Sequence, residues 1–165
     1  MTRLALALAV VLSLGLAAPR AHAEPYAANS VLPTIELPDQ HGAPRAIDDS
    51  VRVVIYTRDM TAGDMVKRAI EKAGSEPFST TGAVYVVNLS GMPSVIRGLF
   101  AMPAMRRRPY AVLVDAEGAK TADFPSAEGR PTVLVLDKLK VVSASNPSSV
   151  DELLAAIAPP APASP

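Results

Sequence analysis

Four short runs of apolar, largely β-branched residues limit most strongly what this chain can fold into. They cover residues 52–57, 83–88, 109–115 and 131–137. The first two lack the alternation of polar and apolar residues that a half-exposed strand shows, so we expect strands buried on both faces. Strands of this kind lie in the centre of a sheet that is covered on both sides.

Segments with helical spacing separate these strands. Apolar residues recur at intervals of three and four along residues 65–73, with Thr61 as the predicted N-cap and Gly74 just past the end. A second helix is predicted to open at Pro93, since proline suits an early helical position. Its apolar stripe is expected to consist of Val95, Ile96, Leu99 and Phe100.

The remaining segments complete a mixed sheet. Residues 32–37 alternate in polarity and precede a turn cluster at 38–42, which predicts an edge strand and a hairpin turn. Residues 140–142 are predicted to run antiparallel to the fourth strand, and a last helix begins after Ser148 or Ser149. Strands that alternate with helices in this way indicate a sheet packed against helices.

The two ends of the chain differ in character from its middle. Arg3, an apolar run over residues 4–16 and the small residues of Ala21-His22-Ala23 are typical of a cleavable secretory signal peptide over residues 1–23. The alternative, a membrane anchor, needs about 20 apolar residues. We therefore expect an exported protein with no membrane anchor after cleavage, one domain over residues 24–158 and a disordered Pro/Ala tail over 159–165.

Composition excludes several classes of function. The chain has no cysteine, which removes disulfides, thiol nucleophiles and thiolate metal sites. Loss of the signal peptide leaves His41 as the last histidine, so a multi-histidine metal site is excluded. The mature chain has 14 basic and 16 acidic side chains, which does not suggest a nucleic-acid partner. No glycine-rich phosphate loop follows a strand, so no cofactor is predicted.

The order of the predicted elements resembles the thioredoxin-like fold, in the variety found in exported thioredoxin-like and peroxiredoxin-like proteins. Residues 37–42 are similar to the opening segment of those families, and Val53–Thr57 resembles the strand that feeds the active-site loop. Residues 110–118 and 129–137 resemble their paired later strands. The resemblance implies an α/β fold: a three-layer sandwich with a mixed central sheet and helices on both faces.

The redox site of that fold is degenerate in this chain. By the resemblance, Met60-Thr61-Ala62-Gly63 falls where the family has Cys-x-x-Cys, so Met60 and Gly63 occupy the two sulfur positions. A thioether cannot form a thiolate and glycine has no side chain, so dithiol exchange is excluded. Leu139 stands where these families usually have a turn glycine. The chain is also similar to the uncharacterised bacterial periplasmic proteins of the YtfJ type, which bring no settled activity.

Pro131 is the first candidate for partner binding. The resemblance places it where the family keeps a cis-proline, beside which an extended partner segment adds a strand. The alternative is a trans proline at the start of a strand, where no ladder donor is required.

The second candidate is the stretch of methionines, prolines and arginines over residues 90–110. Its methionines are suited to an adaptable apolar surface and its arginines to an acidic group. The alternative is that the methionines fill the core and the arginines form a solvated rim. The candidate partner-binding residues are Met92, Met102, Met105, Arg106, Arg107 and Arg108.

Two further alternatives concern chemistry. Thioethers can ligate Cu(I), with Met60, Met65, Met92, Met102 and Met105 as candidates, but the methionines lack close repeated spacing. Asp59 and Asp64 flank the degenerate loop and could serve as acid and base, or hold a small anion together with Arg106–Arg108.

The leading interpretation is an exported, periplasmic, thioredoxin-like protein without redox activity, which binds an unidentified protein or peptide. The alternative is an enzyme or carrier for a small anionic ligand.

Overall fold

The computed structural model describes residues 25–76, 78 and 81–158. The predicted signal peptide and the predicted Pro/Ala tail lie outside the described residues. Within the described part of the chain, no helix is both long enough and apolar enough to cross a bilayer.

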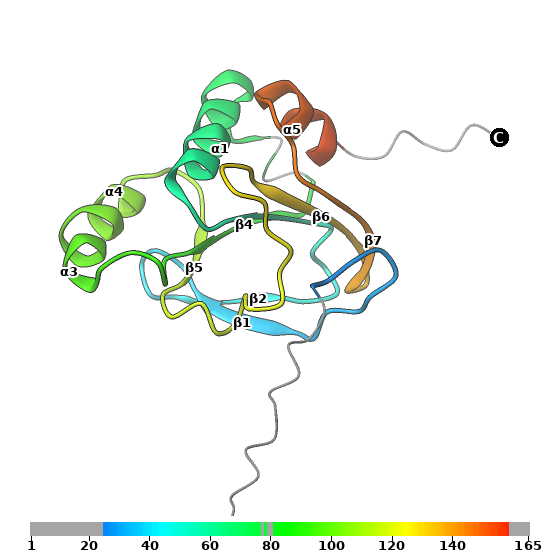
Figure 1. Cartoon of the computed structure of the whole chain (residues 1–165), viewed down its shortest axis with the longest axis horizontal. Coiled ribbons are helices and arrows are strands. Elements are labelled where there is room, and N and C mark those ends of the chain that lie inside the picture. The colour runs from blue at the N-terminus through cyan, green and yellow to red at the C-terminus, as the bar shows by residue number, and fades with distance from the viewer. Residues whose placement is uncertain (1–24, 77, 79–80, 159–165) are drawn as a thin grey trace, which may run out of the picture.

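A five-stranded mixed sheet forms the centre of the molecule (Figure 1). Its strand order is β5-β4-β3-β6-β7, in which β3, β4 and β5 run parallel, whereas β6 and β7 are antiparallel to their neighbours. The strands are β3 (Val53–Thr57), β4 (Ala83–Asn88), β5 (Val112–Asp115), β6 (Thr132–Asp137) and β7 (Lys140–Ser145). The predicted α/β class and mixed central sheet are confirmed.

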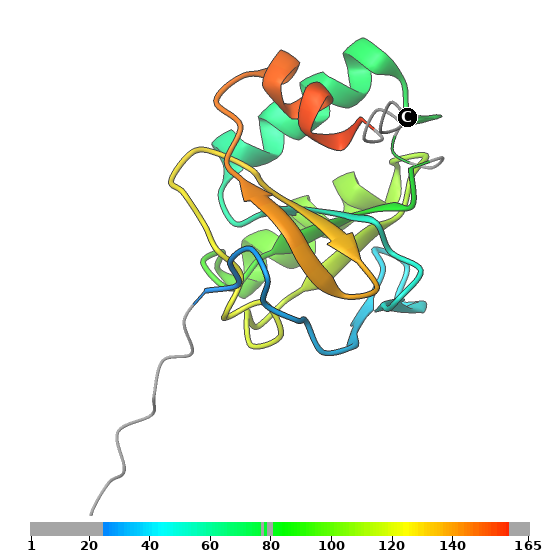
Figure 2. The same ribbon diagram turned by 90° about the vertical axis from the view of Figure 1, so that its right-hand side faces the viewer.

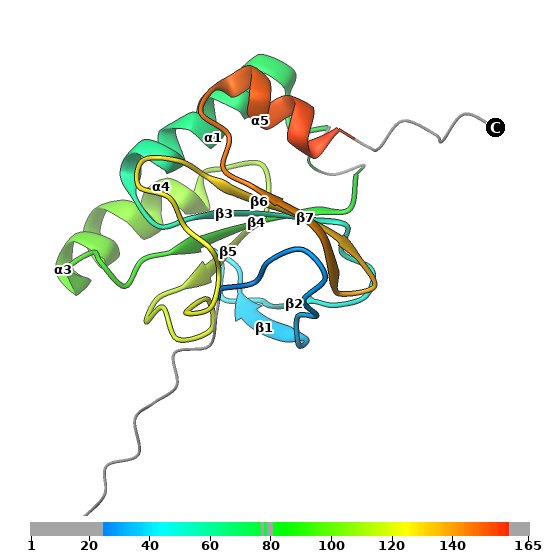
Figure 3. The same cartoon turned by 45° about the vertical axis from the view of Figure 1, so that its right-hand side comes forward.

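The helices lie on one face of this sheet (Figure 3). They are α1 (Met60–Ala73), a continuous helical segment made of α3 (Ser94–Ile96), the π-helical turn η1 (Arg97–Ala101) and α4 (Met102–Arg106), and the final α5 (Val150–Ile157). Helix α5 packs beside α1 above the β6–β7 hairpin (Figure 2). Buried side chains from α1, α4, α5 and the sheet form one apolar cluster between these layers.

The opposite face is covered by a hairpin and loops. Strands β1 (Ile35–Pro38) and β2 (Pro44–Ile47) pair antiparallel and pack on the sheet through a second apolar cluster. Phe124, from the loop before β6, belongs to the same cluster. The three layers are as expected, but helices do not cover both faces. The steps from β3 to β4 and from β4 to β5 run in the same direction, and right-handed crossovers then place both connecting helices on one face.

The start of α1 differs from the prediction. Asp59, not Thr61, is the N-cap: its backbone is extended and its carboxylate accepts a hydrogen bond from the amide of Ala62 at 2.9 Å. The predicted end is confirmed, since Gly74 follows the helix with a φ of +78°.

The β6–β7 hairpin forms without a turn glycine. Lys138 and Leu139 both adopt positive φ, 47° and 67°, between the paired residues Asp137 and Lys140. Two-residue hairpin turns with positive φ at both positions match the twist of the flanking strands. The pairing of β6 with β7 therefore holds Lys138 and Leu139 in the left-handed backbone region, which costs residues other than glycine about 1–2 kcal/mol each.

Candidate functional site

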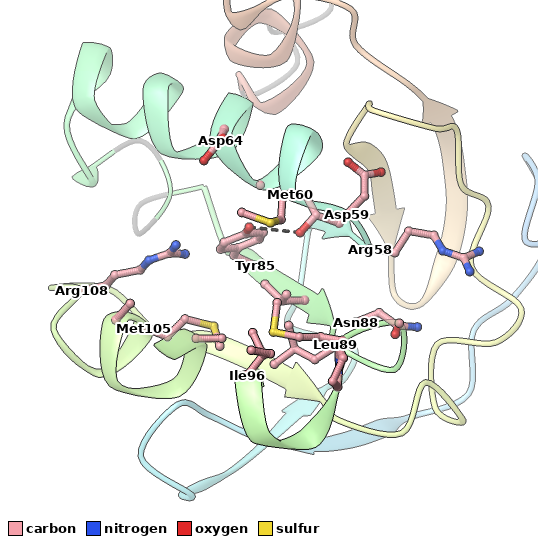
Figure 4. Close-up of a pocket in the computed structure, with 18 residues that line it drawn as sticks. Arg58, Asp59, Met60, Asp64, Tyr85, Asn88, Leu89, Ile96, Met105 and Arg108 are labelled. Atoms are coloured by element: carbon pink, nitrogen blue, oxygen red, sulfur yellow. Dashed lines mark hydrogen bonds between the residues drawn. The ribbon is translucent and has the colours of Figure 1, made fainter. Parts of the chain in front are cut away.

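A groove of about 530 Å³ opens where β3 and β4 end, between the start of α1 and the α3–η1–α4 segment (Figure 4). Its floor comes from β4 and the residues after it, and its walls from the two helices. Lining residues include Tyr85, Val87 and Leu89 on the floor, Met60, Gly63 and Asp64 on one wall, and Met92, Ile96, Met105 and Arg108 on the other. The lining is mainly apolar, with a few polar groups.

The degenerate redox loop forms part of this groove. Met60 stands on its rim with 76% of its surface exposed, and Gly63 lines the same wall. A β-carbon added at Gly63 would lie 3.8 Å from the hydroxyl of Tyr85, which is ordinary contact. The groove therefore lies at the position where the resemblance places a redox pair, but neither Met60 nor Gly63 can form a disulfide.

Tyr85 supplies the polar group of the floor. It is buried, and its hydroxyl shares a hydrogen bond of 3.1 Å with that of Thr57. Burial raises the pKa of the Tyr85 phenol, an effect opposed by Thr57 and by the nearby Arg108 guanidinium. The phenol is therefore neutral at physiological pH and can donate or accept a hydrogen bond.

Asp59 and Asp64 do not form an acid–base pair. Asp59 uses one carboxylate oxygen to cap α1 and the other to accept a hydrogen bond from the amide of Gly129 at 3.1 Å. Asp64 is exposed on the first turns of α1. Because both oxygens of Asp59 hold backbone amides, its role is structural.

The predicted apolar stripe of the second helix faces solvent. Val95, Ile96, Leu99 and Phe100 are 64%, 45%, 66% and 65% exposed, and we call these four side chains the apolar ridge. Ile96 also lines the groove. An apolar stripe normally faces the core, so its exposure here is a property of the surface that the spacing alone did not reveal.

Pro103 follows a π-helical turn that contains part of the ridge. Proline has no amide hydrogen, so the carbonyl of Leu99, four residues earlier, cannot accept an α-helical hydrogen bond from it. The preceding turn is π-helical, with the amide of Met102 donating to the carbonyl of Arg97. The Arg97 guanidinium packs inward and donates to the carbonyl of Ala116 at 2.6 Å.

The structure brings together some of the predicted partner-binding residues and separates others. Met92, Met105 and Arg108 line the groove, although Met105 is otherwise buried. The remaining candidates, Met102, Arg106, Arg107 and Pro131, are not among the residues that line it.

Each residue outside the groove has a different setting. Met102 is half-buried against the core, and Arg106 donates to the carbonyl of Gln40 at 3.1 Å. Arg107 is exposed. Pro131 is buried, and its peptide bond is trans, as are all those among the described residues. The arginine run therefore contributes Arg108 to the groove and does not surround Asp59 and Asp64 as a cluster.

Sequence reasoning missed Tyr85 and the ridge as parts of the site. The signal for Tyr85 was a hydroxyl-bearing residue inside an otherwise aliphatic strand. For the ridge, the spacing gave no signal that distinguishes a solvent-facing stripe from a buried one.

The groove does not offer a conventional metal site. The described residues contain no group of three or more His, Cys, Asp or Glu side chains that could hold a metal ion. Of the five methionines considered for copper, Met60, Met92 and Met105 line the groove, and Met65 packs in the core.

Comparison with solved structures identifies the class of fold. The peroxidoxin BcpB from Mycobacterium tuberculosis is similar over 79% of this chain and 96% of its own, with 25% identity and a TM-score of 0.53. The thioredoxin domain of a thiol-disulfide oxidoreductase from Bacteroides vulgatus has 12% identity and a TM-score of 0.54, covering 80% of this chain and 96% of that one. The fold is thioredoxin-like.

A third similar structure is described as a thiol:disulfide interchange protein DsbE from Chlorobium tepidum. It has 15% identity and a TM-score of 0.51 over 81% of this chain and 99% of its own. No protein-family model matches the sequence, and no curated protein matches it. The class defined by fold and site is thus a thioredoxin-like protein whose redox position contains no cysteine.

Proposed function

We propose that this protein is exported to the periplasm and there binds a segment of another protein along the groove and the apolar ridge. The observation that carries the proposal is the exposure of four large apolar side chains beside a groove at the degenerate redox position. Contiguous exposed apolar patches mark interaction sites, whereas isolated exposed apolar residues need no explanation.

The ridge and the groove form one continuous surface. Ile96 belongs to both, and Met60 extends the apolar surface across the groove to α1. Burying one large apolar side chain contributes about 1.5–3 kcal/mol. Covering several of them supplies a free energy that can offset the loss of translational freedom on association.

Export is supported by the segment over residues 1–23 and by the kind of protein that the chain resembles. Disulfide chemistry in bacteria takes place outside the cytoplasm, and two of the similar structures are described as thiol-disulfide proteins. Without cysteine, the surface that such proteins use can serve for binding but not for exchange.

Site-specific photocrosslinking in the cell of origin tests the proposal. A benzoylphenylalanine at Leu99 should give a discrete adduct with another protein, whereas the same probe at the exposed Lys120 should not. The additional substitution Phe100→Ser should reduce the Leu99 adduct at least several-fold, because it removes an exposed apolar side chain without disturbing the core. Identical adduct patterns from Leu99 and Lys120 would contradict the proposal.

A further inference from the structure

We propose that the bound segment carries an acidic side chain whose carboxylate pairs with Arg108. This inference rests on the proposed docking function and specifies the chemistry of the partner. Figure 4 shows the Arg108 guanidinium directed toward Tyr85 from the edge of the groove.

Arg108 is a preorganised cation that interacts with the hydroxyls of Tyr85 and Tyr110 but, among the described residues, forms no ion pair with a carboxylate. It is half-buried, and its guanidinium lies 5.9 Å from the centre of the Tyr110 ring. Among the described residues, no carboxylate lies within 4.0 Å of it. A guanidinium that stacks on an aromatic ring loses little freedom when it binds a carboxylate in the bidentate manner.

Neighbouring arginines bind backbone carbonyls or a carboxylate of the chain, whereas Arg108 contacts two tyrosines. Arg97 contacts the carbonyl of Ala116 and the carboxylate of Glu117 at 3.4 Å. Arg106 donates to the carbonyl of Gln40. These side chains bind the protein to itself, whereas Arg108 faces the groove.

The other charged groups of the groove do not compensate Arg108. Asp59 is committed to two backbone amides, and Arg58 contacts Ser126 at 3.2 Å. Asp64 lines the opposite wall and is exposed. Glu71, which does not line the groove, adds to the effect of burial in raising the pKa of Tyr110 and forms an ion pair with Lys67 at 3.7 Å.

The shape of the surface favours a protein segment over a small molecule. Val95, Leu99 and Phe100 are not among the residues that line the groove, so an occupant that covers the ridge extends beyond it. Arg108 lines the groove and is half-buried, whereas the ridge side chains are exposed. A backbone lying along the ridge therefore reaches Arg108 through a side chain that projects inward.

Binding of defined peptide pools to the immobilised mature chain tests the inference. The first pool contains random decapeptides, acetylated and amidated, with Asp and Glu permitted. The second excludes Asp and Glu. The third also excludes them but has a free C-terminal carboxylate. We expect retained peptides to come from the first pool and to be enriched in Asp or Glu beside apolar residues.

Variants of the protein identify the pairing group. Arg108→Met should weaken binding of a selected peptide about tenfold to a hundredfold, the usual effect of removing a charge-assisted hydrogen bond. Arg107→Met is the matched control and should leave binding unchanged. Arg108→Lys should restore part of the affinity, and replacing the peptide's Glu by Gln should reproduce the loss. Circular dichroism verifies that each variant is folded.

The outcomes separate the two proposals. Equal retention of the first two pools, sensitive to Leu99→Ser but not to Arg108→Met, overturns the acidic partner and leaves docking in place. If only the third pool is retained, the carboxylate that pairs with Arg108 comes from a chain terminus, and the proposal of an acidic side chain is overturned. Retention of no pool, together with no adduct from position 99, overturns the proposed function itself.

Discussion

At the scale of single residues, the Gln40 side chain forms the backbone hydrogen bonds that a neighbouring strand would otherwise form at the edge of β5. Its amide oxygen accepts a hydrogen bond from the amide of Val112 at 2.8 Å, and its amide nitrogen donates to the carbonyl of Tyr110 at 2.8 Å. It is 2% exposed. Gln40 thus satisfies backbone groups at the outer edge of β5, next to the end of the arginine run.

Replacing Gln40 should destabilise the fold. Gln40→Leu keeps the approximate volume but leaves a buried donor and an acceptor without partners, so the free energy of unfolding should fall by about 2–4 kcal/mol. Urea denaturation followed by circular dichroism measures this change. Glu36→Gln, at an exposed position of β1, is the control and should change stability by less than about 0.5 kcal/mol. A loss no larger than the control's would show that these hydrogen bonds contribute little.

Residue types alone predicted part of the site. Met60 and Gly63 were singled out by their chemistry rather than by their contacts, and both line the groove. The roles of Asp59 and Arg108 depend on contacts with residues distant in the sequence, such as Gly129, which is 70 residues from Asp59. Sequence spacing carries no information on such distant contacts.

At the scale of elements, the start of α1 joins a helix to the loop before β6. Asp59 caps the helix through Ala62 and at the same time holds Gly129. One carboxylate therefore fixes both the degenerate redox loop and the segment that leads to Pro131.

The identity of this cap can be tested by two substitutions. Asp59→Ala should lower the free energy of unfolding by about 1–2 kcal/mol, because it removes a helix cap and a loop hydrogen bond. Thr61→Ala should change it by less than about 0.5 kcal/mol, since Thr61 is exposed. Asp59→Asn should retain much of the capping effect. Thermal denaturation compares the three variants, and a larger loss from Thr61→Ala would restore Thr61 as the cap.

The positions of the strands were predicted more reliably than which face of each helix is buried. Runs of β-branched residues identified β3, β4 and β6 because a strand buried on both faces has few alternatives. The stripe of Val95, Ile96 and Leu99 gave the helical period correctly but not the side that faces the core. Periodicity records which residues share a face, whereas the neighbouring layers decide what covers it.

At the scale of the whole molecule, the groove depends on the order of the strands. The parallel strands β3 and β4 end at the same edge, and both connecting helices lie on one face of the sheet (Figure 1). The two helices therefore stand on either side of these strand ends. The predicted helices on both faces would have separated them.

Export makes a prediction about the N-terminal segment. When residues 1–165 are expressed in a bacterium, we expect the protein released by osmotic shock to begin at Glu24. Intact-mass spectrometry measures the N-terminus. Ala23→Arg should block cleavage, because the signal peptidase requires small residues at this site. Recovery of the uncleaved chain in the cytoplasmic fraction would contradict export.

The π-helical turn η1 has a consequence for how this chain aligns with similar proteins. Such a turn accommodates one residue more than an α-helical turn, which shifts everything after it by about 100° around the helix axis. Relatives with an ordinary helix here should show a one-residue gap within residues 97–101. Deleting Gly98 would bring the two halves of the helix into phase and rotate the ridge relative to Met105. The π-helical turn therefore sets the angle around the helix axis between the exposed ridge and the buried Met105.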